Sequence, residues 1–102
     1  MTDNPHLLVV DDDARLRELL RKFLAERGFR VSTAGDTADA ETKLASFAFD
    51  LLVLDVMLPG EDGIAFTQRL RRKSGVPILL LTARGESQRE TFQLLRILQI
   101  IL

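Results

Sequence analysis

The chain has 102 residues, of which 46% are hydrophobic and 28% are charged, and its formal net charge is −1. This length fits one domain with a single core, and the composition is that of a globular protein and not of a disordered one. The near-neutral charge argues against nucleic-acid binding by this chain alone. The sequence contains no cysteine, which excludes a disulfide framework.

The chain also lacks the features of a membrane or exported protein. No apolar run approaches the roughly 18 to 20 residues that are needed to span a bilayer. Residues 1–6 lack the basic and apolar regions of a signal peptide. We therefore expect a cytoplasmic protein with no membrane partner.

The first elements are a strand, a helix and a second strand. Residues 7–10 form a short apolar run that predicts the first strand. The apolar residues that follow recur at helical spacing and predict a helix: Leu16, Leu19, Leu20, Phe23 and Leu24. We expect its arginines, Arg15, Arg17 and Arg21, to face solvent. Gly28 fits a left-handed residue just past the helix end, and residues 30–34 predict the second strand.

The next elements continue the alternation. Asp36 is a plausible N-cap for a helix ending near Ser46. Residues 50–55 are apolar without alternation and predict a central strand that is buried on both faces. A turn at residues 59–63 precedes a further helix. In this helix we expect one set of residues to face inward (Ile64, Phe66, Thr67 and Leu70) and another to face outward (Arg69, Arg71 and Arg72). Residues 78–82 then predict a fourth strand.

Short apolar strands that alternate with helices predict an α/β domain with a parallel sheet. The last segment is unusual. Residues 87–90 fit a capping box and predict a final helix, but from residue 92 on only Gln93, Arg96 and Gln99 are polar. This apolar segment could lie deep in its own core or pack against another copy of the chain, and residues 97–102 could alternatively form a strand.

Acidic residues follow the predicted strands at their carboxyl ends. Asp11, Asp12 and Asp55 fall there, as does Thr82, and ligands of open parallel sheets bind at this edge. Two carboxylates about 4 Å apart repel by roughly 4 kcal/mol at an effective dielectric near 20, so a cluster of them favours a cation. Oxygen ligands favour Mg²⁺, beside which one carboxylate could accept a phosphoryl group.

Each of these residues also has a simpler explanation. Asp13 precedes a helix and is expected to be a cap and not a ligand, and Asp11 or Asp12 alone could also be a cap. Thr82 alone would be an ordinary strand residue. Asp55 is harder to explain structurally, because it ends a wholly apolar strand. The only histidine, His6, lies near the terminus, which argues against a histidine-dependent triad or zinc site.

Three segments together resemble the receiver domain of bacterial two-component response regulators, most closely the OmpR/PhoB-like class. They are LLVVDDDARLRELL, DLLVLDVMLPGEDG and PILLLTAR, and the resemblance covers about residues 5–87. It implies a flavodoxin-like (CheY-like) fold, with a parallel sheet of strand order 2-1-3-4-5 flanked by helices.

The resemblance also implies a role for each site residue. Asp55 would accept a phosphoryl group from a sensor histidine kinase, and Thr82 and the amide of Ala83 would respond to the phosphate. Asp12, Asp55 and the main-chain carbonyl of Met57 would hold Mg²⁺, and Asp11 would act mainly through a coordinated water. Pro59 and Gly60 would shape the loop after Asp55. In the OmpR/PhoB-like class an effector domain then controls transcription.

The match weakens after Glu86, where the family continues into a fifth strand, its lysine and a fifth helix. The lysines of this sequence are Lys22, Lys43 and Lys73, which lie outside the matching positions. We therefore expect one domain over residues 1–102 with four strands and a divergent apolar tail at 88–102. An exposed edge of the fourth strand, together with this tail, predicts a homo-oligomer.

Two functions follow as hypotheses. The first is a phosphorylatable receiver, which is not an enzyme beyond self-catalysed phosphoryl transfer to and from Asp55. The second is an altered receiver that binds Mg²⁺ but cannot switch and acts mainly by self-association. A haloacid-dehalogenase-like phosphatase is disfavoured, because its second aspartate would fall at Met57.

Overall fold

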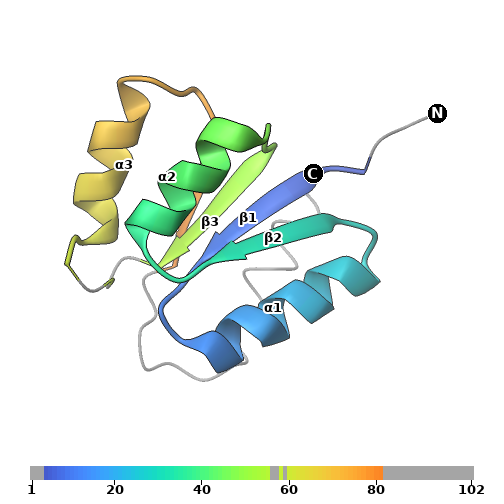
Figure 1. Ribbon diagram of the computed structural model, residues 1–102. Coiled ribbons are helices and arrows are strands. Elements are labelled where there is room, and N and C mark those ends of the chain that lie inside the picture. The colour runs from blue at the N-terminus through green and yellow to red at the C-terminus, as the bar shows by residue number, and fades with distance from the viewer. Residues whose placement is uncertain (1–3, 56–57, 59, 82–102) are drawn as a thin grey trace.

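The computed structural model describes residues 4–55, 58 and 60–81, which form an alternating series of strands and helices (Figure 1). The elements in chain order are β1 (His6–Val10), α1 (Ala14–Glu26), β2 (Arg30–Ala34), α2 (Thr37–Ser46), β3 (Leu51–Asp55), α3 (Gly63–Arg71) and β4 (Ile78–Leu81). The α/β alternation predicted from the sequence is therefore confirmed, with strand bounds within one residue of those expected.

The strands form one parallel sheet of order β2-β1-β3-β4. This is the order that the resemblance implied for the first four strands. In the register, Val10 of β1 is opposite Ala34 of β2 on one side and Leu54 of β3 on the other. The residues that follow β1 and end β3 are therefore neighbours at the carboxyl edge of the sheet.

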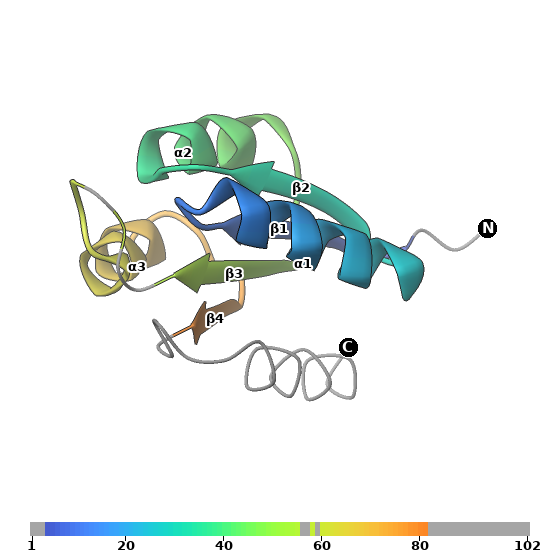
Figure 2. The ribbon, with the colours of Figure 1, turned by 90° about the horizontal axis from the view of Figure 1, so that it is seen from below.

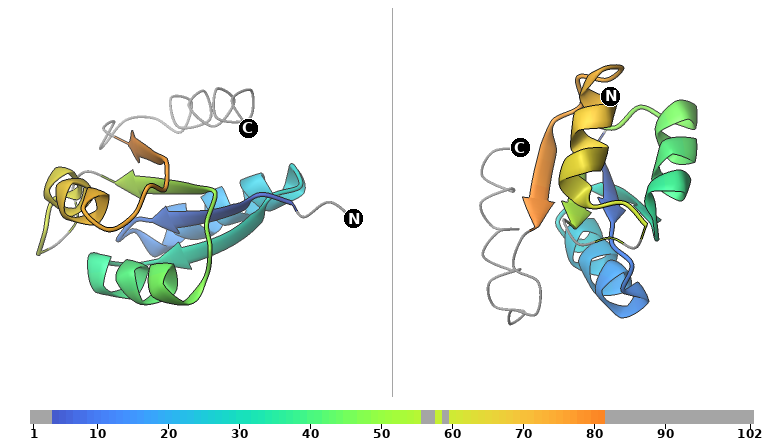
Figure 3. Two further views of the ribbon diagram at one scale, coloured as in Figure 1. Left: turned by 90° about the horizontal axis from the view of Figure 1, so that it is seen from above. Right: turned by 90° about the vertical axis from the view of Figure 1, so that its left-hand side faces the viewer.

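Alternate side chains of the central strands enter two apolar clusters, one on each face of the sheet. Leu8, Val10, Leu52 and Leu54 pack with Phe66 and Leu70 of α3 and with Ala40 of α2. Leu7, Val9, Leu51 and Val53 pack with Leu20 and Leu24 of α1. The sheet is thus a middle layer, with α1 on one face and α2 and α3 on the other (Figures 2 and 3). As predicted, β3 is buried along its whole length.

Aspartate caps fix where the helices begin. The carboxylate of Asp13 accepts the amides of Arg15 and Leu16 at 3.0 and 3.2 Å, and that of Asp36 accepts the amide of Asp39 at 2.8 Å. Both caps were predicted. Gly28 has φ of +95°, the left-handed conformation expected of it after α1.

One expectation about α3 is wrong. Ile64 was expected to face inward, but 51% of its surface is exposed, whereas Phe66 and Leu70 are buried. Phe66 and Leu70 are one helical turn apart and define the buried stripe. Ile64 precedes Phe66 by two residues, about 200° around the helix, so it faces the opposite side.

Several sequence predictions lie outside the described residues. They concern Met57, Pro59, Thr82, Ala83 and the segment 88–102, so their roles stay predictions. Within the described part of the chain, no helix is both long enough and apolar enough to cross a bilayer.

Candidate metal centre

Three aspartates converge at the carboxyl edge of β1 and β3. Asp55 is the last residue of β3, and Asp11 directly follows Val10, whose partner in the register is Leu54. Asp12 continues from Asp11 into the turn before α1. One carboxylate oxygen from each of Asp11, Asp12 and Asp55 lies within 4.8 Å of the others. The juxtaposition predicted from the two strands is therefore observed, and we call these residues the acid cluster.

Two of the three members of the acid cluster are shielded from water. Asp11 is 3% exposed and Asp55 is 7% exposed, and they are the buried charged residues of the described part of the chain. Asp12 is exposed and gives the cluster an open side. Charged side chains are seldom this buried unless a partner or a metal compensates them.

The environment of Asp11 disfavours its ionised form. The pKa of the Asp11 carboxyl is raised from 3.8 to about 6, mainly by burial and also by the neighbouring charges of Asp55, Asp12 and Asp13. A hydrogen bond from the amide of Asp13, 2.8 Å from Oδ1, acts in the opposite sense. A bound cation would oppose both the burial and the repulsion between the acids.

The donor set of the acid cluster fits Mg²⁺. All its donors are carboxylate oxygens, which this hard cation prefers, and the exposed side leaves room for the waters that it keeps. Ligands about 2.1 Å from Mg²⁺ are at most about 4.2 Å apart. A spread of up to 4.8 Å therefore suits direct binding by some of the oxygens and binding through water by another.

The turn that carries Asp11 and Asp12 is held by hydrogen bonds on both sides. The amide of Asp11 donates to the carbonyl of Ala34 in β2, 3.1 Å away. Nη1 of Arg17 donates to the carbonyl of Asp11 at 2.7 Å. The sequence placed Arg17 on a solvated helix face, and this contact was missed, because a main-chain acceptor leaves no trace in the side-chain pattern.

A second set of contacts anchors residues 60–62, which directly precede α3. Gly60 has φ of +82°, and Asp62 caps α3 by accepting the amide of Ala65 at 2.7 Å. Arg69 donates to both carboxylate oxygens of Glu61, at 3.2 and 2.7 Å, and also pairs with Glu41 of α2. Arg69 was predicted to face solvent, but these ion pairs hold it half-buried between α2 and α3.

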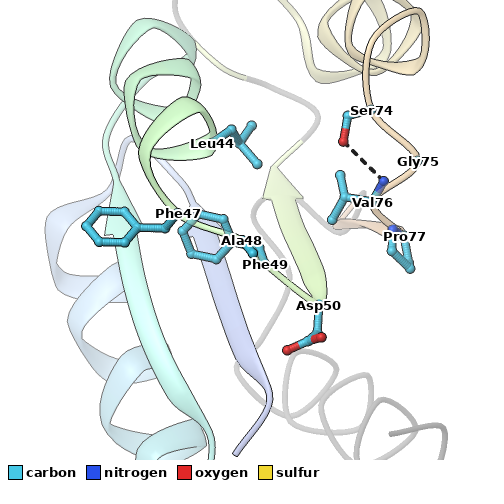
Figure 4. A pocket seen from close by; sticks show the side chains of 9 residues that line it. All are labelled: Leu44, Phe47, Ala48, Phe49, Asp50, Ser74, Gly75, Val76 and Pro77. Atoms are coloured by element: carbon cyan, nitrogen blue, oxygen red, sulfur yellow. Dashed lines mark hydrogen bonds between the residues drawn. The ribbon is translucent and has the colours of Figure 1, made fainter. Parts of the chain in front are cut away.

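An open hollow of about 430 Å³ lies at the other edge of the sheet (Figure 4). Its lining comes from the segment between α2 and β3, including Phe49 and Asp50, and from the segment before β4, including Val76 and Pro77. Asp50 directly precedes β3 and Asp55 is its last residue, so the hollow is separate from the acid cluster.

Residues 7–97 match the family described as response regulator receiver domain. The chain belongs to this family. Receiver domains accept phosphoryl groups and bind Mg²⁺ at an acidic pocket, and response regulators are phosphorylated by sensor histidine kinases. The resemblance inferred from the three sequence segments is therefore confirmed.

Curated relatives include bacterial regulators. Protein PetR of Rhodobacter capsulatus is 57% identical over 84 residues, which are 82% of this chain and 35% of PetR. The transcriptional activator protein PfeR of Pseudomonas aeruginosa is 46% identical over 85 residues, which are 83% of this chain and 28% of PfeR. The chain thus spans about a third of the length of these relatives.

Solved structures show the same fold. The chemotaxis protein CheY4 of Vibrio cholerae is 27% identical, with a TM-score of 0.82 over 97% of this chain and 99% of that one. The response regulator TrrA of Thermotoga maritima, solved in complex with Mg²⁺-BeF, is 39% identical, with a TM-score of 0.72 over 78% of this chain and 70% of TrrA.

Proposed function

We propose that this chain receives a phosphoryl group on Asp55 in a Mg²⁺-dependent reaction. The observation that carries the proposal is the buried carboxylate of Asp55 at the end of β3, within 4.8 Å of carboxylate oxygens of Asp11 and Asp12. A receiver domain needs an acceptor carboxylate beside a cation site, and among the described residues the acid cluster supplies both.

The chemistry follows from the separate environments of the three acids. A carboxylate oxygen of Asp55 attacks the phosphorus of the donor, the bond from phosphorus to the leaving group breaks, and an acyl phosphate forms. When bound, Mg²⁺ would neutralise negative charge on the phosphoryl oxygens. The resemblance assigns Asp12 and Asp55 to direct binding of the cation and Asp11 to binding through a coordinated water, and the closeness of the three carboxylates supports a shared cation site.

The remaining roles are carried over from the resemblance. The main-chain carbonyl of Met57 would complete the cation site, the amide of Ala83 would bind a phosphate oxygen, and the hydroxyl of Thr82 would move toward the phosphate. A sensor histidine kinase is the proposed donor, and transcription control through an effector domain is the proposed output in the cytoplasm. The transcriptional activator PfeR supports this output.

A direct test uses the 102-residue chain with Mg²⁺ and acetyl phosphate, followed by intact mass analysis. We expect an adduct of one phosphoryl group that requires Mg²⁺ and is lost in Asp55→Asn. Asp50→Asn is the matched control, because it makes the same change at the other end of β3 and should retain the adduct. An adduct that persists in Asp55→Asn would contradict the assignment.

The second candidate function is a Mg²⁺-binding module that mainly self-associates. It is favoured by β4, which in the described sheet pairs on one side only, with β3. An unpaired strand edge is a template for another chain. We propose association through this edge and through residues 88–102. Mg²⁺ binding without adduct formation, together with a dimer in light scattering, would favour this function over the first.

A further inference from the structure

We propose that Arg17 and Gly35 form a positioning pair that sets the geometry of the acid cluster for Mg²⁺. The inference deepens the proposed function and rests on it. Arg17 would act through the main chain of Asp11, and Gly35 would leave the space in which the guanidinium lies. Neither residue belongs to the acid cluster.

Arg17 links α1 to the turn that carries the acids. Its Nη1 donates to the carbonyl of Asp11 at 2.7 Å, and its own amide donates to the carbonyl of Asp13 at 2.9 Å. The side chain and the main chain of one residue therefore fix the carbonyls on both sides of Asp12. Two further hydrogen bonds restrain this turn, from the amide of Asp11 to the carbonyl of Ala34 and from the amide of Asp13 to Oδ1 of Asp11.

The guanidinium acts on the main chain and not on a carboxylate. Its hydrogen bond is to the carbonyl oxygen of Asp11, whereas Oδ1 of Asp11 is held by the amide of Asp13 at 2.8 Å. Arg17 thus leaves the side chain of Asp11 directed toward Asp55. A planar guanidinium holds such a geometry more rigidly than an ammonium group, which is a point charge on a flexible stem.

Gly35 follows β2 and lies directly against this guanidinium. A Cβ atom at position 35 would be 3.2 Å from Nη1 and 3.6 Å from Cζ of Arg17. The backbone does not itself require glycine there, because among the described glycines the positive φ values belong to Gly28 and Gly60. A Cβ atom at this position would therefore require the end of the Arg17 side chain to shift by a few tenths of an ångström.

This arrangement predicts that the two residues are coupled. An alanine at position 35 would push the end of the Arg17 side chain and weaken its hydrogen bond to Asp11. In an Arg17→Ala background, which lacks the guanidinium, Gly35→Ala should have no effect on the geometry of the acid cluster. Residues that orient metal ligands without touching the metal typically change its affinity by about 10- to 100-fold.

The test is a double-mutant cycle on the 102-residue chain, with Mg²⁺ affinity measured by titration calorimetry. We expect about tenfold weaker binding in Arg17→Ala and a smaller loss in Gly35→Ala, near the lower end of such effects. The double variant should bind no more weakly than Arg17→Ala. Arg17→Lys should recover part of the loss, because lysine keeps a donor and the charge.

Arg21→Ala is the matched control. It removes the same charge from the same helix, but Arg21 pairs with Glu18, 2.5 Å away, and should leave Mg²⁺ affinity within about twofold of wild type because such surface pairs contribute little. An NMR readout in metal-free protein adds a test that a general loss of stability would not mimic. The amide resonance of Asp13 should shift in Arg17→Ala and in Gly35→Ala, but not in Arg21→Ala.

Two results would overturn the positioning pair while leaving the proposed function intact. One is wild-type Mg²⁺ affinity in both Arg17→Ala and Arg17→Lys. The other is a loss in Gly35→Ala that is equally large when Arg17 is already alanine. If Arg17→Ala does not fold, wild-type Mg²⁺ affinity in both Gly35→Ala and Arg17→Lys would overturn the positioning pair. A wild-type chain that binds no Mg²⁺ would overturn the proposed function as well.

Discussion

Strand β3 is preceded by Asp50 and ends in Asp55, and the two carboxylates lie in different environments. Asp55 is 7% exposed and belongs to the acid cluster. Asp50 is exposed, accepts the amide of His6 at 2.8 Å and returns its own amide to the carbonyl of His6 at 2.8 Å. The carboxylate of Asp55 lies among other carboxylates, whereas that of Asp50 connects the beginnings of β1 and β3.

The difference shows how position in a parallel sheet decides what an acid can do. At the carboxyl edge, the turn after β1 brings Asp11 and Asp12 beside the end of β3, so repulsion accumulates there. At the amino edge, Asp50 meets a main-chain donor and water. Burial and like charge oppose the ionisation of Asp11 at the carboxyl edge, which a bound cation would relieve, whereas Asp50 at the amino edge accepts a main-chain hydrogen bond.

The largest expected effect concerns Asp11. Its folded-state pKa of about 6 exceeds the ordinary 3.8, so its contribution to stability is fully present below pH 3.8 and is lost as the pH rises through 6. At neutral pH the ionised group costs up to about 3 kcal/mol. Asp11→Asn should therefore raise the free energy of unfolding of metal-free protein in urea titrations by about 1 to 3 kcal/mol.

Asp12→Asn is the control for that experiment. Asp12 is exposed, so its substitution should change the metal-free stability much less, within about 0.5 kcal/mol. Equal gains in the two variants would show that net charge, and not the burial of Asp11, controls stability at this edge.

A second contrast between the edges is in Mg²⁺ affinity. Asp12→Asn removes a charged oxygen from the open side of the acid cluster and should weaken Mg²⁺ binding by at least about tenfold, which equals about 1.4 kcal/mol. Asp50→Asn makes the same change at the amino edge and should leave the affinity unchanged. Calorimetric titration decides between them, and equal losses would place the cation elsewhere.

A third prediction separates helix capping from metal binding. Asp13→Ala removes the cap of α1 and should cost about 1 kcal/mol of stability, and so should Asp36→Ala at the start of α2. Only Asp13→Ala should also weaken Mg²⁺ binding, because losing the cap loosens the turn in which the amide of residue 13, which alanine keeps, donates to Oδ1 of Asp11. Unfolding and Mg²⁺ titrations of both variants test this, and equal Mg²⁺ affinities would mean that the turn does not depend on the cap.

The sequence predicted the acid cluster because acids that follow apolar strands can meet only at one edge of a parallel sheet. The adjacency of β1 and β3 in the sheet is enough to predict that Asp11, Asp12 and Asp55 lie close together. Arg17 was missed because it also fits the polar face of an amphipathic helix. Ile64 was placed wrongly because only the observed packing of Phe66 and Leu70 sets the rotation of α3.

The smallest expected effect is the pH response of the amino edge, and its sign is opposite to that of Asp11. Burial, and then the charge of Arg30, lowers the pKa of His6, although a backbone hydrogen bond at Ala48 and the charge of Asp50 oppose this. The centroids of the His6 and Phe49 rings are 4.3 Å apart, and Nε2 of His6 is 2.9 Å from Oγ of Ser32.

Stability contributed by neutral His6 is therefore present above its ordinary pKa of about 6.5 and is lost as the pH falls through the lower folded value. In an Asp11→Asn background, which removes the opposing titration, urea unfolding should give a lower free energy near pH 5 than near pH 8, and His6→Gln should flatten this difference. A difference that persists in His6→Gln would assign the pH response to other groups. Loss of the difference in His6→Gln would show that the stabilities of the two edges respond to pH in opposite directions. The carboxyl edge holds excess negative charge, whereas the amino edge holds a neutral imidazole ring.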